Sequence, residues 1–240
     1  MYRGLIKACS ICLAMPALLL PALGLAVDQT QAGFLLYGVR EASGEESVNR
    51  LLFAPGMLRI EQQNLEAGYI LFNREARAIY SVTPEERTIL VIQPEPGRVK
   101  IPDEIDFKLE RIEDIDSPEI GGSKPQHWRL TVNGKLCRDA ILAPDLMGDQ
   151  RALYRDYMLL LAKQHYLGLN AIPPEYRDPC DDLVHVFAPA LFIEKGLPVR
   201  VWDQQGYQQS LLDFSVEKRF SAEHFQLPKD YQRLPMLHLR

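Results

Sequence analysis

The sequence YILFNREARAIYSVTPEERTILVIQ, which spans Tyr69–Gln93, is the strongest indicator of fold class in the chain. Three runs in it are rich in β-branched and aromatic residues: Tyr69–Asn73, Arg77–Val82 and Thr88–Gln93. Short runs of this kind, separated by a few polar residues, predict antiparallel strands. Tyr69–Phe72 and Ile89–Ile92 are apolar on both faces, whereas a sheet with one wet face would alternate. The middle of the sheet is therefore covered on both sides, or one face lines an apolar cavity.

Strand-like runs continue on both sides of this stretch. They are Phe34–Arg40, Val48–Ala54 and Met57–Glu61 before it, and Phe107–Ile112, His127–Val132, Leu136–Leu142, Val199–Trp202 and Tyr207–Phe220 after it. Asn133-Gly134 lies between two of these runs and predicts a type I′ hairpin turn, which needs positive φ at both residues. The chain is thus expected to be rich in antiparallel sheet.

One long helix is expected between Asp149, which can cap its N-terminus, and Gly168, which suits the position after its C-terminus. Apolar residues recur between them at helical spacing, which predicts a well-buried helix. Asp181–Phe187 is a candidate for a second, short helix. Strands and helices together predict a single α+β domain.

The first 26 residues have the pattern of a secretory signal peptide. A basic start and an uncharged apolar run, Ala8–Leu20, lead to small residues that end at Ala26. We expect cleavage after Ala26, with Thr30-Gln31-Ala32 as a second candidate, which leaves residues 27–240 as one domain exported to the periplasm. The alternative is an uncleaved membrane anchor, because Ala8–Val27 is long enough to span a bilayer. No other stretch is predicted to cross a membrane.

Composition limits the partners of the exported domain. Loss of Arg3 and Lys7 with the signal leaves 25 of the 27 basic residues against 32 acidic ones, a net charge of −7. This balance disfavours nucleic acid and an anionic bilayer surface as partners. Acidic residues are densest in Asp103–Asp116, which lacks the glycine and terminal glutamate of a calcium loop. We interpret it as a solvated segment.

Two cysteines remain after cleavage, Cys137 and Cys180. A pair of cysteines in an exported chain predicts a disulfide. One alternative is a zinc site that uses Cys180 and His185, for which the irregular spacing is weak support. The other alternative is two buried free thiols.

No arrangement of residues indicates catalysis. The histidines show no metal-ligand spacing along the chain: His127, His165, His185, His224 and His238. The sequence has neither a Gly-x-Ser-x-Gly nucleophile motif nor a glycine-rich phosphate loop. We therefore predict that the protein is not an enzyme and has no metal and no cofactor.

The order of the segments suggests a family. An export signal leads to a first strand at Gly33–Arg40, the hairpins of Tyr69–Gln93, a late strand at Leu197–Trp202 and the ending Phe225–Tyr231. This order resembles the LolA/LolB-like group of periplasmic lipoprotein carriers and related exported proteins. The resemblance implies a strongly curved antiparallel sheet, an incomplete barrel, covered by helices. It also implies an apolar cavity for acyl chains, with Leu153–Leu167 as its lid.

The leading functional prediction is a periplasmic protein that binds lipid or lipoprotein acyl chains without catalysis. Candidate cavity residues come from the doubly apolar strands and from the long helix: Tyr69, Leu71, Ile89, Val91, Leu153, Tyr157 and Leu160. The first alternative is an envelope interaction or sensor module with a solid core and a protein partner. The second is an enzyme whose site is dispersed in sequence.

Overall fold

The computed structural model describes residues 29–63, 68–94, 97, 99–113, 116–169 and 171–236. The predicted signal peptide, residues 1–26, and the cleavage site after Ala26 lie outside these residues. Among the described residues, no helix combines the length and the apolar character needed to cross a bilayer.

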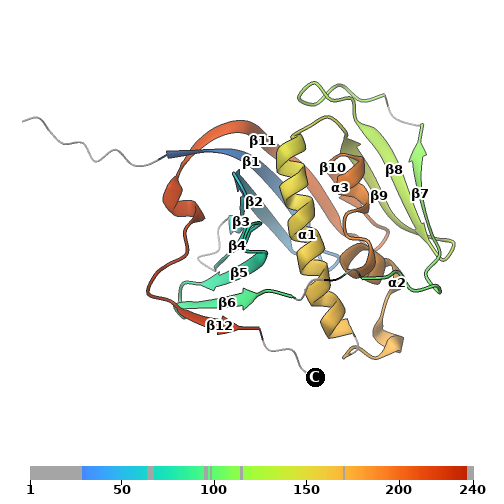
Figure 1. The fold of residues 1–240 in the computed structure, drawn as a ribbon. Coiled ribbons are helices and arrows are strands. Elements are labelled where there is room, and N and C mark those ends of the chain that lie inside the picture. The colour runs from blue at the N-terminus through green and yellow to red at the C-terminus, as the bar shows by residue number, and fades with distance from the viewer. Residues whose placement is uncertain are drawn as a thin grey trace, which may run out of the picture.

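Twelve strands make up one sheet (Figure 1). Their bounds are β1 Gln29–Arg40, β2 Glu46–Ala54, β3 Met57–Gln63, β4 Tyr69–Asn73, β5 Ala78–Thr83, β6 Thr88–Ile92, β7 Phe107–Ile112, β8 Gln126–Val132, β9 Lys135–Ala143, β10 Leu197–Trp202, β11 Gln208–Ser221 and β12 Gln232–Pro235. Their order across the sheet is β12-β6-β5-β4-β3-β2-β1-β11-β10-β9-β8-β7. The runs of Tyr69–Gln93 form three consecutive antiparallel strands, as predicted.

The local predictions for strands and turns are confirmed along most of the chain. Strands β4 and β7 have the predicted bounds, and the other predicted strands agree to within two residues at each end, except that β1 begins at Gln29 rather than Phe34. Asn133 and Gly134 have φ values of 49° and 75°, as a type I′ turn requires.

The helical segments comprise one long helix and several short pieces. They are α1 Gly148–Leu169, η1 Pro174–Tyr176, α2 Pro179–Asp182, η2 Leu183–Phe187, α3 Leu191–Lys195 and η3 Ala222–Phe225. The predicted long helix is therefore present, although Gly168 lies within its last turn rather than after it. The predicted second helix corresponds to α2 and η2. Figure 1 shows α1 crossing one face of the sheet, with α2 and α3 beside it near β9 and β10.

The predicted fold class, an antiparallel sheet covered by helices, is wrong in two respects. First, the sheet is mixed, because β12 pairs in parallel with β6, with Gln232 opposite Thr88 and Pro235 opposite Val91. No strand was predicted at this end of the chain, yet β12 is extended, and its backbone bonds to the edge of β6, from Gln232 N to Arg87 O at 2.9 Å and from Met236 N to Val91 O at 3.0 Å.

Second, the helices are too few to cover the sheet. A helix of 22 residues such as α1 is about 33 Å long and about 10 Å wide. Twelve strands at a spacing of about 4.8 Å span about 53 Å along the sheet. The remaining helical pieces have at most five residues each. The sheet is therefore the largest part of the structure, and helices lie over only part of one of its faces.

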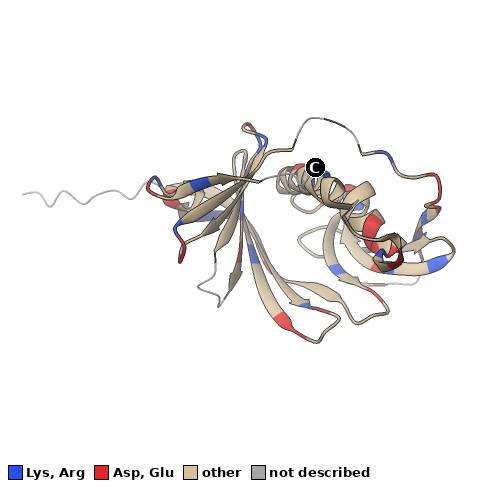
Figure 2. Cartoon of the chain, turned by 90° about the horizontal axis from the view of Figure 1, so that it is seen from below, with Lys and Arg blue, Asp and Glu red and all other residues tan. Residues whose placement is uncertain are grey.

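The sheet has an inner face, which contacts α1, and an outer face on the opposite side. The inner core cluster joins residues of α1 to Leu35, Leu58 and Phe72 on three strands. The outer core cluster joins Leu52 and Leu71 to the C-terminal segment around Phe225. Seen from below, the strands of the first half and strands β7–β9 lie on either side of the helices (Figure 2).

Candidate functional site

The four strand residues predicted to line a cavity lie on the outer face. Register places Tyr69 opposite Val82 and Val82 opposite Ile89. It likewise places Leu71 opposite Tyr80 and Tyr80 opposite Val91. Directly paired residues point to the same side of a sheet, and Leu71, Tyr69 and Tyr80 belong to the outer core cluster.

The three predicted helix residues lie on the inner face instead. Leu153, Tyr157 and Leu160 are all buried in the inner core cluster. From the same strands, this cluster takes Ile70, Phe72, Ile79, Leu90 and Ile92. The seven candidates are therefore divided between the two faces and do not line one common space.

A cavity of about 330 Å³ lies on the inner face, between α1, the segment η2–α3 and the ends of β9–β11. Most of its wall is apolar. Representative lining residues are Tyr154, Tyr157, Met158, Leu161, Phe192 and Val201. Of the seven predicted cavity residues, only Tyr157 contributes to this wall. A second, larger groove beside the β1–β2 turn is lined mainly by charged and polar side chains, so it is a poor site for an apolar ligand.

Three tyrosines of the cavity wall stay neutral far into the alkaline range. Burial raises the pKa of Tyr157 to about 12. Burial, together with neighbouring tyrosines, also raises the pKa of Tyr154, and burial raises the pKa of Tyr207. These phenols therefore offer hydrogen bonds and ring surface but no charge. The Tyr207 hydroxyl donates to Gln209 Oε1 at 3.1 Å, which fixes one polar group inside the cavity.

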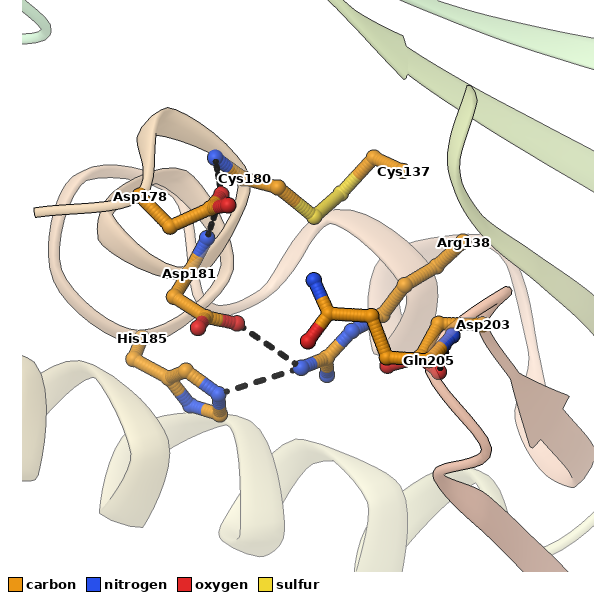
Figure 3. The surroundings of a disulfide bond; sticks show 8 residues. All are labelled: Cys137, Arg138, Asp178, Cys180, Asp181, His185, Asp203 and Gln205. Atoms are coloured by element: carbon orange, nitrogen blue, oxygen red, sulfur yellow. Dashed lines mark hydrogen bonds and ion pairs between the residues drawn. A yellow bond between two sulfur atoms is a disulfide. The ribbon is translucent and has the colours of Figure 1, made fainter. Parts of the chain in front are cut away.

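Arg138 forms a cationic end of the cavity. Its neighbours are drawn in Figure 3. Its Nη2 lies 3.4 Å from Asp181 Oδ1 and 3.3 Å from His185 Nε2. Its guanidinium carbon is 5.0 Å from the centre of the Tyr207 ring, within the range of a cation–π contact. Burial and the neighbouring Arg138 charge lower the pKa of His185, so the imidazole is neutral at pH 7 and Nε2 accepts from Arg138.

A disulfide holds the two chain segments that form this end. Cys137 and Cys180 are bonded, with their Cα atoms 5.6 Å apart. Arg138 follows the first cysteine on β9, and Asp181 follows the second at the start of the helical segment (Figure 3). The predicted disulfide is thus confirmed, and it leaves no free thiol at Cys180 for a zinc site. Among the described residues, no group of three metal-ligating side chains is assembled.

A β-bulge explains how neighbouring residues reach the same side of β9. Leu130 pairs with Arg138, whereas Thr131 pairs with Leu136, so Cys137 is an extra residue in the ladder. A bulge redirects side chains and breaks the strict alternation of a strand. Cys137 can therefore reach Cys180 while Arg138 reaches Asp181 and His185. Sequence reasoning missed Arg138, and its position next to a predicted disulfide cysteine was the only available signal.

A second buried polar cluster lies between β8 and β9. His127 Nε2 is 2.9 Å from Asp139 Oδ1, and Arg129 Nε donates to the same oxygen at 2.9 Å. The His127 ring also stacks on Trp202 at 5.6 Å. Each charged group thus has an oppositely charged or hydrogen-bonding neighbour, as a structural cluster requires.

Comparisons with known proteins give little guidance. No protein-family model matches the chain, and a search of curated proteins found no match. Among solved structures, an uncharacterized conserved protein from Thermus thermophilus is 10% identical with a TM-score of 0.43, and the alignment covers 86% of this chain and 91% of that one.

Two structures of PNGF-II, in space groups C2 and P21, are also similar. They are 7% and 6% identical, with TM-scores of 0.40 and 0.41, and each alignment covers 86% of this chain. The alignments cover only 31% and 32% of PNGF-II, so the chain spans about a third of its length. Similarity at this level carries no functional argument.

Proposed function

We propose that the protein is a non-enzymatic binding protein that encloses an acyl chain or similar small apolar group in the inner-face cavity. The observation that carries this proposal is the cavity of about 330 Å³ with its mainly apolar wall. Ligand pockets commonly measure about 300–1,000 Å³ and combine an apolar lining with a few polar groups. The inner-face cavity has both properties.

The size of the cavity limits the ligand. A volume of about 330 Å³ equals that of roughly eleven water molecules at about 30 Å³ each. This suits one short acyl chain rather than the several chains of a lipoprotein. Each buried CH₂ contributes about 0.8 kcal/mol, so eight of them would contribute roughly 6 kcal/mol before the entropic costs of binding.

The periplasm is the compartment that we propose for this activity. The predicted signal peptide at residues 1–26 supports export. The Cys137–Cys180 disulfide supports an oxidising compartment, because cytosolic proteins rarely keep disulfides. LolA/LolB-like carriers, which the sequence resembles, are periplasmic proteins, so the resemblance agrees with export and with an oxidising compartment. We include a relationship to that group in the proposal.

Mass spectrometry of organic extracts tests the proposal directly. The protein is purified without detergent, and the extract is analysed for lipids and fatty acids. We expect a reproducible ligand near one molecule per protein, since an apolar cavity is most stable when filled. Extracts without any such compound, together with no uptake of added fatty acid, would show that the proposal is wrong.

Two variants on α1 separate binding in the cavity from binding elsewhere. Met158 lines the cavity, whereas its neighbour Leu159 lines a different pocket with Arg74 and Arg77. Met158→Trp should fill the cavity and lower ligand occupancy at least about tenfold, because overpacking leaves no room for a chain. Leu159→Trp is the matched control and should keep the ligand. Equal occupancy in both variants would place the ligand outside the cavity.

The interaction-module alternative has its own supporting observation. Four large apolar side chains are exposed near the end of α1 and after it: Tyr166, Leu167, Ile172 and Tyr176. An exposed apolar group of this kind can mark a contact with a protein partner. Ligand-free extracts combined with one stoichiometric co-purifying protein would favour this alternative over the cavity.

A further inference from the structure

We propose that the ligand carries a single carboxylate and that Arg138 binds it at the cationic end of the cavity. The inference rests on the proposed function and adds the chemical class of the ligand, a fatty acid or similar amphipathic monoanion. The acyl chain would lie along Met158 and Leu161, and the head group would meet the guanidinium.

The charge of Arg138 is poorly compensated by the protein. Its side chain is only 12% exposed, whereas its partner Asp181 is 61% exposed. The N–O distance of 3.4 Å is long, because charge-assisted hydrogen bonds normally measure about 2.7–2.9 Å. An exposed pair of this geometry contributes little, while a guanidinium removed from water needs strong partners.

The hydrogen-bonding groups of Arg138 are also incompletely used. Nη2 points to Asp181 and His185, but the buried Nε has no hydrogen-bond partner among the described residues. A carboxylate binds a guanidinium with two parallel hydrogen bonds, which Nε and a terminal nitrogen can supply together. Nε is closed to solvent, so a ligand carboxylate meets the terminal nitrogens of Arg138 first and reaches Nε only when the side chain turns towards the cavity.

The surroundings of Arg138 favour one negative charge over two. His185 is neutral and adds no positive charge. Asp181 is already beside the guanidinium, and Asp203 is drawn next to Arg138 in Figure 3. The Oδ1 of Asp203 accepts from the backbone N–H groups of Gln205 and Tyr207. A phosphate dianion would meet these carboxylates, and Arg138 is the one Lys or Arg among the described residues of the cavity wall. A monoanionic carboxylate adds one negative charge fewer beside these carboxylates, so it is the better match.

The first experiment needs no variant. Binding of decanoate, decan-1-ol and decyl phosphate to the delipidated full-length protein is measured by isothermal titration calorimetry at pH 7.5. We expect decanoate to bind about tenfold or more tightly than decan-1-ol, since only the acid pairs with the guanidinium. Decyl phosphate should bind more weakly than decanoate. Tighter binding of the phosphate would contradict the carboxylate assignment.

The second experiment changes the cation. Arg138→Gln should lower the affinity for decanoate to that for decan-1-ol, and it should leave the affinity for decan-1-ol unchanged. Arg138→Lys keeps a positive charge and should restore part of the preference for decanoate. Arg177→Gln is the matched control, because Arg177 pairs with Asp182 on the same helical segment and does not line the cavity. Circular dichroism confirms that each variant folds.

The outcomes separate this inference from the proposed function. Equal affinity of the wild type for acid and alcohol would overturn the head-group assignment and leave the apolar cavity in place. An Arg138→Gln variant that keeps the preference for acid would also overturn it. Failure of the acid, the alcohol and the phosphate alike to bind would overturn the proposed function itself.

Discussion

On strands β4 and β5, the inner face packs against the long helix α1, while the outer face packs against the short C-terminal segment around Phe225. Both faces are apolar in sequence along these strands. On the inner face, the packing against α1 is followed by the cavity towards β9–β11. On the outer face lies an ion-pair cluster of Arg50, Arg59 and Glu61. A strand that is apolar on both faces can therefore pack against a helix on one face and against an extended chain segment on the other.

The largest expected effect comes from truncating one phenylalanine on each face. Phe72 on the inner face is 2% exposed and meets the Tyr157 ring edge-on at 5.9 Å. Phe72→Ala should lower the free energy of unfolding by about 3–5 kcal/mol. Phe225 on the outer face is 9% exposed, and Phe225→Ala should cost about half as much, because the short segment η3 can collapse into the space. Urea unfolding followed by circular dichroism measures both, and equal losses would show that the two covers are equivalent.

The next largest effect concerns the Cys137–Cys180 disulfide, which joins β9 to α2. The disulfide joins residues 43 apart in sequence, and no corresponding bond among the described residues ties the C-terminal segment to the outer face. The double variant Cys137→Ala, Cys180→Ala should lose about 2–4 kcal/mol of stability, because the unfolded chain gains freedom. Reduction of the wild type should give the same loss in chemical denaturation. A loss below about 1 kcal/mol would show that packing alone holds η2 in place.

The smallest effect concerns the ion-pair cluster of the outer face. Burial alone would raise the pKa of Glu61, but hydrogen bonds from Arg59 and Arg50 outweigh it and lower the pKa below its ordinary value of 4.5. The resulting stability is complete above pH 4.5 and is lost as the pH falls through the lowered pKa. Glu61→Gln should cost about 1 kcal/mol at pH 7 and reduce the pH dependence of unfolding below pH 4.5. An unchanged acid slope in this variant would assign the dependence to other carboxylates.

Much of the local structure could be predicted from the sequence. Runs such as Tyr69–Asn73 and Phe107–Ile112 matched the observed strand bounds, because strand propensity and turn residues act over a few positions. The two cysteines left after the predicted signal form the observed disulfide, since only one pairing was available. The parallel pairing of β12 with β6 had no local signal, as it joins segments more than 140 residues apart through backbone hydrogen bonds.

The candidate site was less predictable than the strands. Alternation assigns a strand residue to a face only when one face is polar, so the apolar run Tyr69–Phe72 left the choice open. Tyr69 and Leu71 are predicted as cavity residues, and the register places them on the outer face instead. Arg138 was overlooked because strict alternation would direct it away from Cys137, and only the bulge brings both to the same side.

Short-range patterns therefore determined the strands, the Asn133-Gly134 turn and the long helix, and the number of cysteines determined the disulfide pair. The mixed order of the sheet, the division of apolar residues between its faces, and the cationic end of the cavity depended on tertiary structure. The physical reason is the range of the interactions. Propensity and turn geometry depend on neighbouring residues, whereas register, parallel pairing and the placement of Arg138 depend on segments that meet only when the whole sheet has formed.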